Sequence, residues 1–288
     1  MQRRDRHFAA KRRWIMEGGI EGLFHGVVNT VVDRWPRSRP LGSLLHFCRI
    51  ISHRGEHDNR RRFENTLPAF DAACAAGVWG IELDVRWTRD LEPVVFHDPD
   101  TRRLFGTCNA IGKLSLDRLK RDFPLIPTLK DVIARYGGRL HLMIEIKSES
   151  YPDPAVQSRR MKKTLRHLSA GEEYHLMSLS PGMFVHFGFL PSRAFIPIGR
   201  MRMDRISRLA ANKGWGGVAG HFLTTSTHCV NSQHRRGKMV GTGFVDSANC
   251  LYREATRGVD WLFSNRAAHI QNICSRGQSN AQSSNNAA

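Results

Sequence analysis

The chain has 288 residues, of which 41% are hydrophobic, and this is enough apolar material for one large α/β domain or two small ones. Its 44 lysines and arginines outnumber its 26 aspartates and glutamates, so the formal charge at pH 7 is +18 and the isoelectric point is about 10.5. This charge favours anionic partners such as phosphates, nucleic acid or acidic lipid surfaces, and it does not choose among them.

Cysteine spacing and hydropathy argue against zinc-binding, disulfide-rich and membrane-spanning classes of protein. The six cysteines stand far apart with no Cys-x-x-Cys pair, which argues against a zinc site or a disulfide framework and favours a reducing cytoplasm. No window holds about 18 uninterrupted apolar residues, so we expect no membrane-spanning helix. The basic start also lacks a signal-peptide core, because Glu17, Glu21 and His25 interrupt it.

Residues 1–45 are predicted to form a basic N-terminal extension. Six of the first 13 residues are lysine or arginine, and the apolar positions after them predict an amphipathic helix. These positions are Ile20, Leu23, Phe24, Val27, Val28, Val31 and Val32. The helix either covers the outside of the main domain or lies in the plane of an anionic membrane, where residues 1–36 would make a peripheral contact.

After a linker at residues 35–40, short apolar runs alternate with amphipathic segments of helix length, including 67–76, 155–168, 203–212 and 248–257. Strands are expected near 49–53, 80–85, 93–97, 141–147, 174–178, 194–198, 215–220, 238–245 and 260–264. Alternating β and α units predict a parallel sheet, and about eight repeats predict a (β/α)8 TIM barrel over residues 46–274. The Ser-, Asn-, Gln- and Ala-rich residues 275–288 are expected to form a disordered tail.

Two predicted strands carry charged residues on one face. Glu82 and Asp84 alternate with apolar residues, and Glu145 and Lys147 repeat the pattern, so these side chains are expected to point into the barrel. Two carboxylates about 4 Å apart repel by roughly 4 kcal/mol at an effective dielectric near 20, so three require a cation or a proton among them. Oxygen ligands favour Mg2+, Ca2+ or Mn2+ over zinc. The alternative is an ion-paired or exposed face without a metal.

His53 and His97 each end a predicted strand, where barrel enzymes place their chemistry. Imidazole has a pKa near 6.5, so two histidines on opposite sides of a metal could serve as acid and base. Arg54 adds a forked donor suited to a phosphate. A structural histidine and a surface ion pair are the alternatives, and which histidine is the acid stays open.

Six motifs stand in order between residues 50 and 147: His53-Arg54-Gly55, Glu64-Asn65-Thr66, Gly80-Ile81-Glu82-Leu83-Asp84-Val85, Val94-Val95-Phe96-His97-Asp98, Ile126-Pro127-Thr128-Leu129 and Ile144-Glu145-Ile146-Lys147. In this order and spacing, the chain resembles the glycerophosphodiester phosphodiesterase family, with a weaker match at Gly258-Val259-Asp260. The resemblance implies a TIM barrel that uses a divalent metal to hydrolyse glycerophosphodiesters to glycerol 3-phosphate and an alcohol.

The resemblance also implies roles for single residues. Glu82, Asp84 and Glu145 would hold the metal, with Glu64 beside them. The acid and base would be His53 and His97, and the phosphate would be bound by Arg54 and Lys147. Independently of this likeness, Asn65 or Thr66 is a candidate cap for the helix that follows.

The chain departs from the family pattern in places. Eight residues separate the first two motifs, more than family members usually have, and they include Arg60, Arg61 and Arg62. This loop either binds an anionic head group or lipid phosphate, or is a solvated basic loop. Late in the chain, Gly243-Phe244-Val245-Asp246 and Ser264-Asn265-Arg266 replace the usual residues, so only Phe244 is a candidate for pocket packing and no role is carried onto Ser264-Asn265-Arg266.

Two other functions stay open. One is lysophospholipase D-like cleavage of lysophospholipids, which the basic amphipathic start favours. The other is a non-catalytic barrel that binds anions or membrane, although no specific nucleic-acid motif is present. The sequence leaves the head group, the metal and the oligomeric state undecided.

Overall fold

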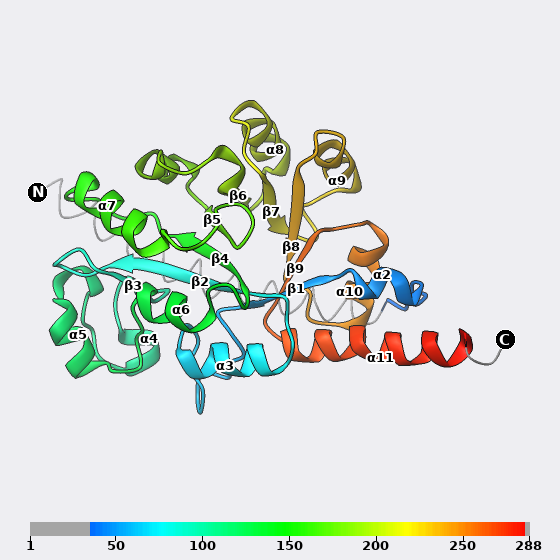
Figure 1. Ribbon diagram of the computed structural model, residues 1–288, viewed down its shortest axis with the longest axis horizontal. Helices are drawn as coiled ribbons and strands as arrows, with labels where there is room; N and C mark the ends of the chain where they lie inside the picture. Colours follow the sequence, from blue (N-terminus) through cyan, green and yellow to red (C-terminus); the bar gives the residue numbers. More distant parts are fainter. Residues whose placement is uncertain (1–34, 286–288) are drawn as a thin grey trace, which may run out of the picture.

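The computed structural model describes residues 35–285, and within them eight parallel strands close into a barrel (Figure 1). β1 (Arg49–His53) pairs with β2 (Gly80–Trp87) on one side and with β9 (Trp261–Ser264) on the other, which closes the sheet. The other barrel strands are β4 (His141–Ile146), β5 (Tyr174–Ser178), β6 (Phe195–Gly199), β7 (Gly217–His221) and β8 (Met239–Gly243). The predicted (β/α)8 TIM barrel is confirmed.

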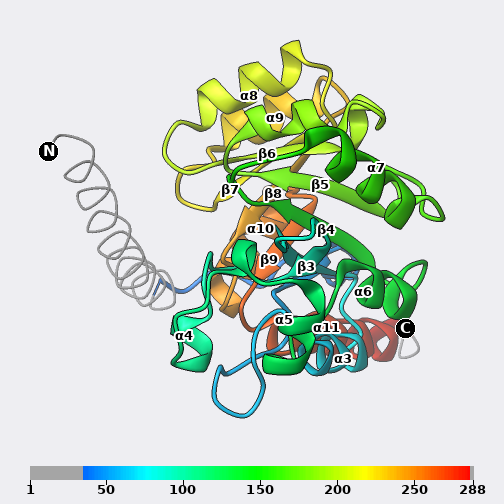
Figure 2. The same cartoon turned by 90° about the vertical axis from the view of Figure 1, so that its left-hand side faces the viewer.

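Helices surround the strands, with α3 (Leu67–Ala75) and α11 (Ala267–Asn285) opposite α8 (Met203–Asn212) and α9 (Thr227–His234) (Figure 2). The short α2 (Gly42–His46) packs on α11. α7 (Pro154–Leu165) and α10 (Ala248–Thr256) complete the ring, whereas short 3-10 turns, η2 (Pro181–Phe187) and η3 (Ser192–Ala194), connect β5 to β6. Side chains of Asp153, Ser226 and Ser247 cap the starts of α7, α9 and α10.

The ends of the chain bear on two sequence expectations. α11 continues past residue 275, where the sequence predicts a disordered tail. The amphipathic helix expected within residues 1–34 lies outside the described residues, so it and the proposed division of the chain stay predictions. Among residues 35–285, no helix is both long enough and apolar enough to cross a bilayer.

The connection from β2 to β4 differs from the expected pattern. The run near 93–97 forms β3 (Pro93–Val95), which pairs antiparallel with β2 and is not a barrel strand. After it come α4 (Arg102–Phe105), η1 (Ile111–Lys113), α5 (Leu116–Asp122) and α6 (Leu129–Tyr136), and α6 begins at a capping box between Thr128 and Asp131. This crossover has an apolar cluster of its own, made of Val94, Phe96, Ile111, Leu114, Leu119, Phe123 and Ile126.

Alternation along the strands separates two apolar regions. Ile81, Leu83 and Val85 belong to the core shared with the helices, as predicted. A second cluster is formed by side chains of alternate strand residues and fills the barrel: Ile51, Met143, Met177, Ile196, Ala219, Trp261 and Phe263. At the end where β4 begins, His141 Nε2 lies 2.8 Å from His175 Nδ1 and the His141 ring stacks on Trp79. The charged site lies at the other end, where β2 and β4 finish.

Candidate active site

Three buried carboxylates meet at the carboxyl ends of β2 and β4. β2 supplies Glu82 and Asp84, and the pairing of Asp84 with Glu145 brings in the carboxylate of β4. One oxygen of each lies within 4.8 Å of the others. Two cations lie beside them, because Lys147 Nζ is 2.5 Å from Asp84 Oδ1 and 2.8 Å from Glu145 Oε1, while Arg54 Nε is 3.1 Å from Asp84 Oδ2.

The charges of this cluster fit a divalent metal ion. Burial and the neighbouring Asp84 and Glu145 raise the pKa of Glu82 well above its ordinary value, so without an added cation this carboxyl favours its proton. Burial alone would also raise the pKa of Asp84, but Lys147 and Arg54 hold that pKa well below its ordinary value. Glu82, Asp84 and Glu145 each offer a carboxylate oxygen, and these oxygens lie close enough together to share one ion. An all-oxygen donor set of this kind suits Mg2+, Ca2+ or Mn2+.

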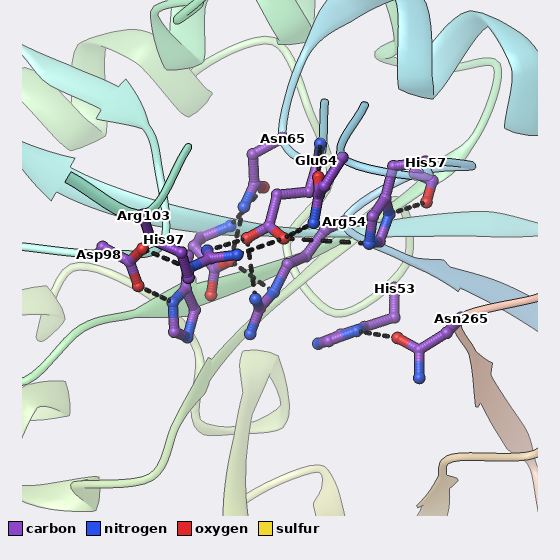
Figure 3. Close-up of polar contacts among 12 residues, drawn as sticks. His53, Arg54, His57, Glu64, Asn65, His97, Asp98, Arg103 and Asn265 are labelled. Atoms are coloured by element: carbon purple, nitrogen blue, oxygen red, sulfur yellow. Dashed lines mark hydrogen bonds and ion pairs between the residues drawn. The ribbon is translucent and has the colours of Figure 1, made fainter. Parts of the chain in front are cut away.

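Glu64, expected beside the metal, is not part of this carboxylate cluster. Its Oε1 lies 2.9 Å from Arg54 Nη1 and 2.5 Å from Arg103 Nη2, and its Oε2 accepts bonds from Arg103 Nη1 and Asn59 Nδ2 (Figure 3). Burial would raise the pKa of Glu64, but the two guanidinium groups lower it strongly. Both oxygens are therefore occupied, and Arg54 stands between Glu64 and Asp84. Spacing along the sequence did not reveal the second arginine.

The Glu64-Asn65-Thr66 motif orients the site more than it caps a helix. Asn65 Nδ2 donates to Asp84 Oδ2 at 2.7 Å, and Asn65 Oδ1 accepts from the Asp84 backbone at 3.2 Å. Thr66 occupies the N-cap position of α3, but its hydroxyl donates to the carbonyl of Phe63 and accepts no bond from the helix. Thr66 thus stands at the predicted N-cap position without a capping side-chain bond, and Asn65 fixes a proposed metal ligand.

The backbone of the His-Arg-Gly motif explains its glycine. Gly55 has φ +78°, and a Cβ atom there would lie 2.7 Å from the carbonyl carbon of Ala69 at the start of α3. Arg54 is also left-handed at φ +57°, and its carbonyl accepts a bond from the backbone of Asn65. This turn aims the Arg54 side chain between its two acidic partners.

His53 comes from β1 and is held by a residue that the sequence motifs did not mark. Its Nδ1 lies 2.7 Å from Asn265 Oδ1, and its Nε2 lies 3.7 Å from Glu82 Oε2. Asp246 accepts from the backbone and from Nδ2 of Asn265, so the amide oxygen faces the ring and Nδ1 is the protonated nitrogen. Phe244 contacts the ring edge-on at 4.7 Å. Burial and then Arg54 lower the pKa of His53 to about 3.

His97 reaches the site from the crossover, not from a barrel strand as expected. It follows β3, and its Nδ1 lies 2.7 Å from Asp98 Oδ1. Asp98 Oδ2 in turn accepts from Arg103 Nε at 2.6 Å. Burial lowers the pKa of His97, although the Asp84 carboxylate and then the Asp98 carboxylate oppose this. Both predicted histidines thus lie at the barrel mouth, which is the end of the barrel that carries the carboxylate cluster. Each has its Nδ1 fixed and its Nε2 left for chemistry.

The arginine-rich loop between the first two motifs is tightly built. Asp58 Oδ1 accepts the backbone N–H groups of Arg60, Arg61 and Arg62 at 2.9, 2.8 and 3.0 Å. Asn59, with φ +54°, connects the loop to Glu64. The three arginine residues are exposed. The turn therefore presents three exposed cationic side chains in the connection between β1 and α3, and Asn59 links this connection to the site.

Known proteins resemble this chain over most of its length. Residues 53–269 match the sequence profile of the Glycerophosphoryl diester phosphodiesterase family. A glycerophosphodiester phosphodiesterase of Bacillus altitudinis is 25% identical over 234 residues, which cover 75% of this chain and 94% of that protein. Another, from Caldanaerobacter subterraneus, is 34% identical over 125 residues, which cover 39% of this chain and 51% of the relative.

Solved structures share the fold. The glycerophosphodiester phosphodiesterase of Thermotoga maritima gives a TM-score of 0.65 at 20% identity, over 78% of this chain and 98% of that one. An Oleispira antarctica phosphodiesterase in complex with the product sn-glycerol-3-phosphate gives 0.66 at 21% identity, over 81% of this chain and 96% of that one.

Proposed function

Because this chain belongs to the glycerophosphoryl diester phosphodiesterase family, we propose that it hydrolyses glycerophosphodiesters to glycerol 3-phosphate and an alcohol with a divalent metal ion and two histidines. The observation that carries this proposal is the gathering of Glu82, Asp84 and Glu145 within 4.8 Å at the barrel mouth. His53 and His97 lie at the same mouth with anchored rings. The related fold that holds sn-glycerol-3-phosphate supports the product.

The residues at the barrel mouth have different proposed roles, in metal binding and in phosphate binding. Glu82, Asp84 and Glu145 would hold Mg2+, Ca2+ or Mn2+, and a bound ion of this kind supplies positive charge to a phosphate oxygen and a substrate hydroxyl. Arg54 and Lys147 bind the phosphate and offset the charge that grows on it in the transition state. Lys147 is buried, and Asp84 and Glu145 raise its pKa against the effect of burial, so it carries a full charge at neutral pH.

The hydrogen-bond partners of the histidines support separate roles for them. His53 rests on the neutral amide of Asn265, which leaves Nε2 as an acceptor and suits the base that deprotonates the nucleophile. His97 rests on the Asp98 carboxylate, which stabilises the protonated ring and suits the acid that protonates the leaving alcohol.

The test is a product assay with defined metals. Glycerophosphocholine and glycerophosphoethanolamine should release glycerol 3-phosphate with added Mg2+, Ca2+ or Mn2+ and not with EDTA. Lysophosphatidylcholine, run in parallel, would release choline together with lysophosphatidate. Absence of all turnover with every metal would instead favour a non-catalytic anion-binding barrel.

An exposed apolar residue after a barrel strand makes lysophospholipids a second candidate substrate class. Met201 is 81% exposed and lies between β6 and α8, after the carboxyl end of a barrel strand, which is the end that carries the active site. Such a side chain could contact an acyl chain. The choline assay on lysophosphatidylcholine decides between the two substrate classes.

A reducing cytoplasm as the location of the protein is also part of the proposal, because all six cysteines are free thiols.

The loop of Arg60, Arg61 and Arg62 is proposed to attract the anionic substrate. Replacing all three by alanine should raise KM by about tenfold and leave kcat unchanged, because exposed charges strengthen encounter and binding more than chemistry. A charge-matched control replaces Lys162, Lys163 and Arg166, which lie on and just after α7. An unchanged KM on every diester, or an equal rise in the control, would contradict a role for this loop.

The N-terminal extension is proposed to give peripheral contact with anionic membrane. Deleting residues 1–36 should reduce co-sedimentation with vesicles containing phosphatidylserine, because the deletion removes both the basic arm and the segment predicted to form an amphipathic helix. Hydrolysis of a water-soluble diester serves as the control for folding. Unchanged binding to the vesicles would rule this contact out.

A further inference from the structure

Arg103 lies where the crossover meets the active site. It belongs to α4, a helix of four residues whose Phe105 packs against the rings of Phe63, Phe96 and Phe123 at centroid distances of 5.6, 6.1 and 5.2 Å. This aromatic packing anchors the helix to the apolar cluster of the crossover. The guanidinium of Arg103 is thereby held over the mouth although its side chain is 44% exposed.

The guanidinium of Arg103 contacts two carboxylates of the site, Asp98 and Glu64. Arg103 Nε donates to Asp98 Oδ2 at 2.6 Å, while Nη1 and Nη2 donate to Glu64 Oε2 and Oε1 at 3.0 and 2.5 Å (Figure 3). Asp98 holds His97 on one side. On the other side, Glu64 holds Arg54 at 2.9 Å. The sequence of contacts therefore runs from a proposed acid to a proposed phosphate ligand through a single side chain.

We propose that Arg103 is a positioning residue that sets His97 and Arg54 together, by holding Asp98 and Glu64 on one guanidinium. The inference rests on the proposed function for its catalytic readout. Only the fork of arginine offers three donors in one plane to two carboxylates, so lysine cannot replace it. Without it, Asp98 loses its cation, and Glu64 keeps only Arg54 and Asn59 as side-chain hydrogen-bond donors. The two carboxylates that hold the His97 ring and the Arg54 side chain are then less restrained, although both direct contacts are kept.

The experiment compares Arg103→Met, Arg103→Lys and Arg103→Ala with Arg102→Met. Arg102 is the adjacent exposed residue and contacts Cys108, so it controls for charge and for local structure. Arg103→Met should lower kcat by about 100-fold with a smaller change in KM, because small displacements of reacting groups have effects of this size. Arg103→Lys should remain within a few-fold of Arg103→Met, and Arg102→Met should match the wild type. Millimolar guanidinium should partly restore Arg103→Ala, whereas methylammonium should not.

A second readout does not need turnover. In 15N spectra of the imidazole side chains, the Nδ1–H signal of His97 should shift or broaden in Arg103→Met and stay in place in Arg102→Met. If kcat is unchanged and the His97 signal keeps its position, the proposal is wrong even where the melting temperature falls. If the wild type hydrolyses no diester, the proposed function fails, and the His97 signal alone still decides whether Arg103 positions the ring.

Discussion

Metal-dependent hydrolysis should disappear when Glu82 is replaced by glutamine, with kcat/KM falling by at least about 1,000-fold, since the loss of a metal that stabilises transition-state charge removes several kcal/mol. Glutamine keeps the size of the side chain, removes its charge and replaces one acceptor oxygen by an NH2 donor. The wild type treated with EDTA should show the same loss and recover with added Mg2+, Ca2+ or Mn2+, whereas Glu82→Gln should not recover. The assay is release of glycerol 3-phosphate from glycerophosphocholine.

The same substitution should not weaken the metal-free fold. Because the pKa of Glu82 is raised, the folded state favours the protonated carboxyl, and its stabilising contribution is lost as the pH rises above the ordinary value of 4.5. At pH 8 the metal-free Glu82→Gln protein should therefore melt at the same temperature as the metal-free wild type or higher. Thermal melts with EDTA measure this directly.

Metal added at about 100 times its Kd should stabilise the wild type by about 2.7 kcal/mol and should not stabilise Glu82→Gln. Glu149→Gln is the matched control, because Glu149 is also a carboxyl whose pKa burial raises, yet it contacts Arg86 and lies outside the carboxylate cluster. This control should keep the response to metal. A metal-induced shift in Glu82→Gln equal to that of the wild type would exclude Glu82 as a ligand.

The sequence predicted the faces of the strands well and their partners less well. Alternation placed Glu82, Asp84 and Glu145 inside the barrel, because a two-residue period leaves no other face for them. The short run of β3 looked like the barrel strands, since three apolar residues carry no information on whether their partner is parallel or antiparallel. His97 was therefore correctly expected at the active site, but it reaches the site from the crossover and not from the end of a barrel strand.

Residues that act through long-range contacts gave no local signal. Asn265 is 212 positions from His53, and only the closure of β9 against β1 brings the two together. Arg103 lies on a four-residue helix, which is too short to show a period. Glu64 was placed beside the metal by the family resemblance. Two arginines from separate segments occupy its oxygens, and spacing does not reveal such pairing.

The two histidines should be separable by the leaving group. On glycerophosphocholine, His53→Ala and His97→Ala should each lower kcat by about 1,000-fold, because general acid and base catalysis contribute about 100- to 10,000-fold each. A glycerophosphodiester with a nitrophenol leaving group needs little protonation to depart. With that substrate His97→Ala should regain most of the lost rate, while His53→Ala should stay slow, because the nucleophile must still lose its proton.

Asn265→Ala and Asp98→Asn change the partners of the two histidines, so their rates should lie between those of the wild type and the histidine variants. Asn265→Ala should resemble a mild form of His53→Ala and slow both substrates, because only the orientation of the base is lost. Asp98→Asn should slow hydrolysis of glycerophosphocholine more than hydrolysis of the nitrophenyl diester, since the carboxylate that stabilises protonated His97 is gone.

The reverse pattern between His53→Ala and His97→Ala would exchange the roles of acid and base. Equal losses on both substrates for His97→Ala would mean that this ring orients the phosphate and does not protonate the leaving group.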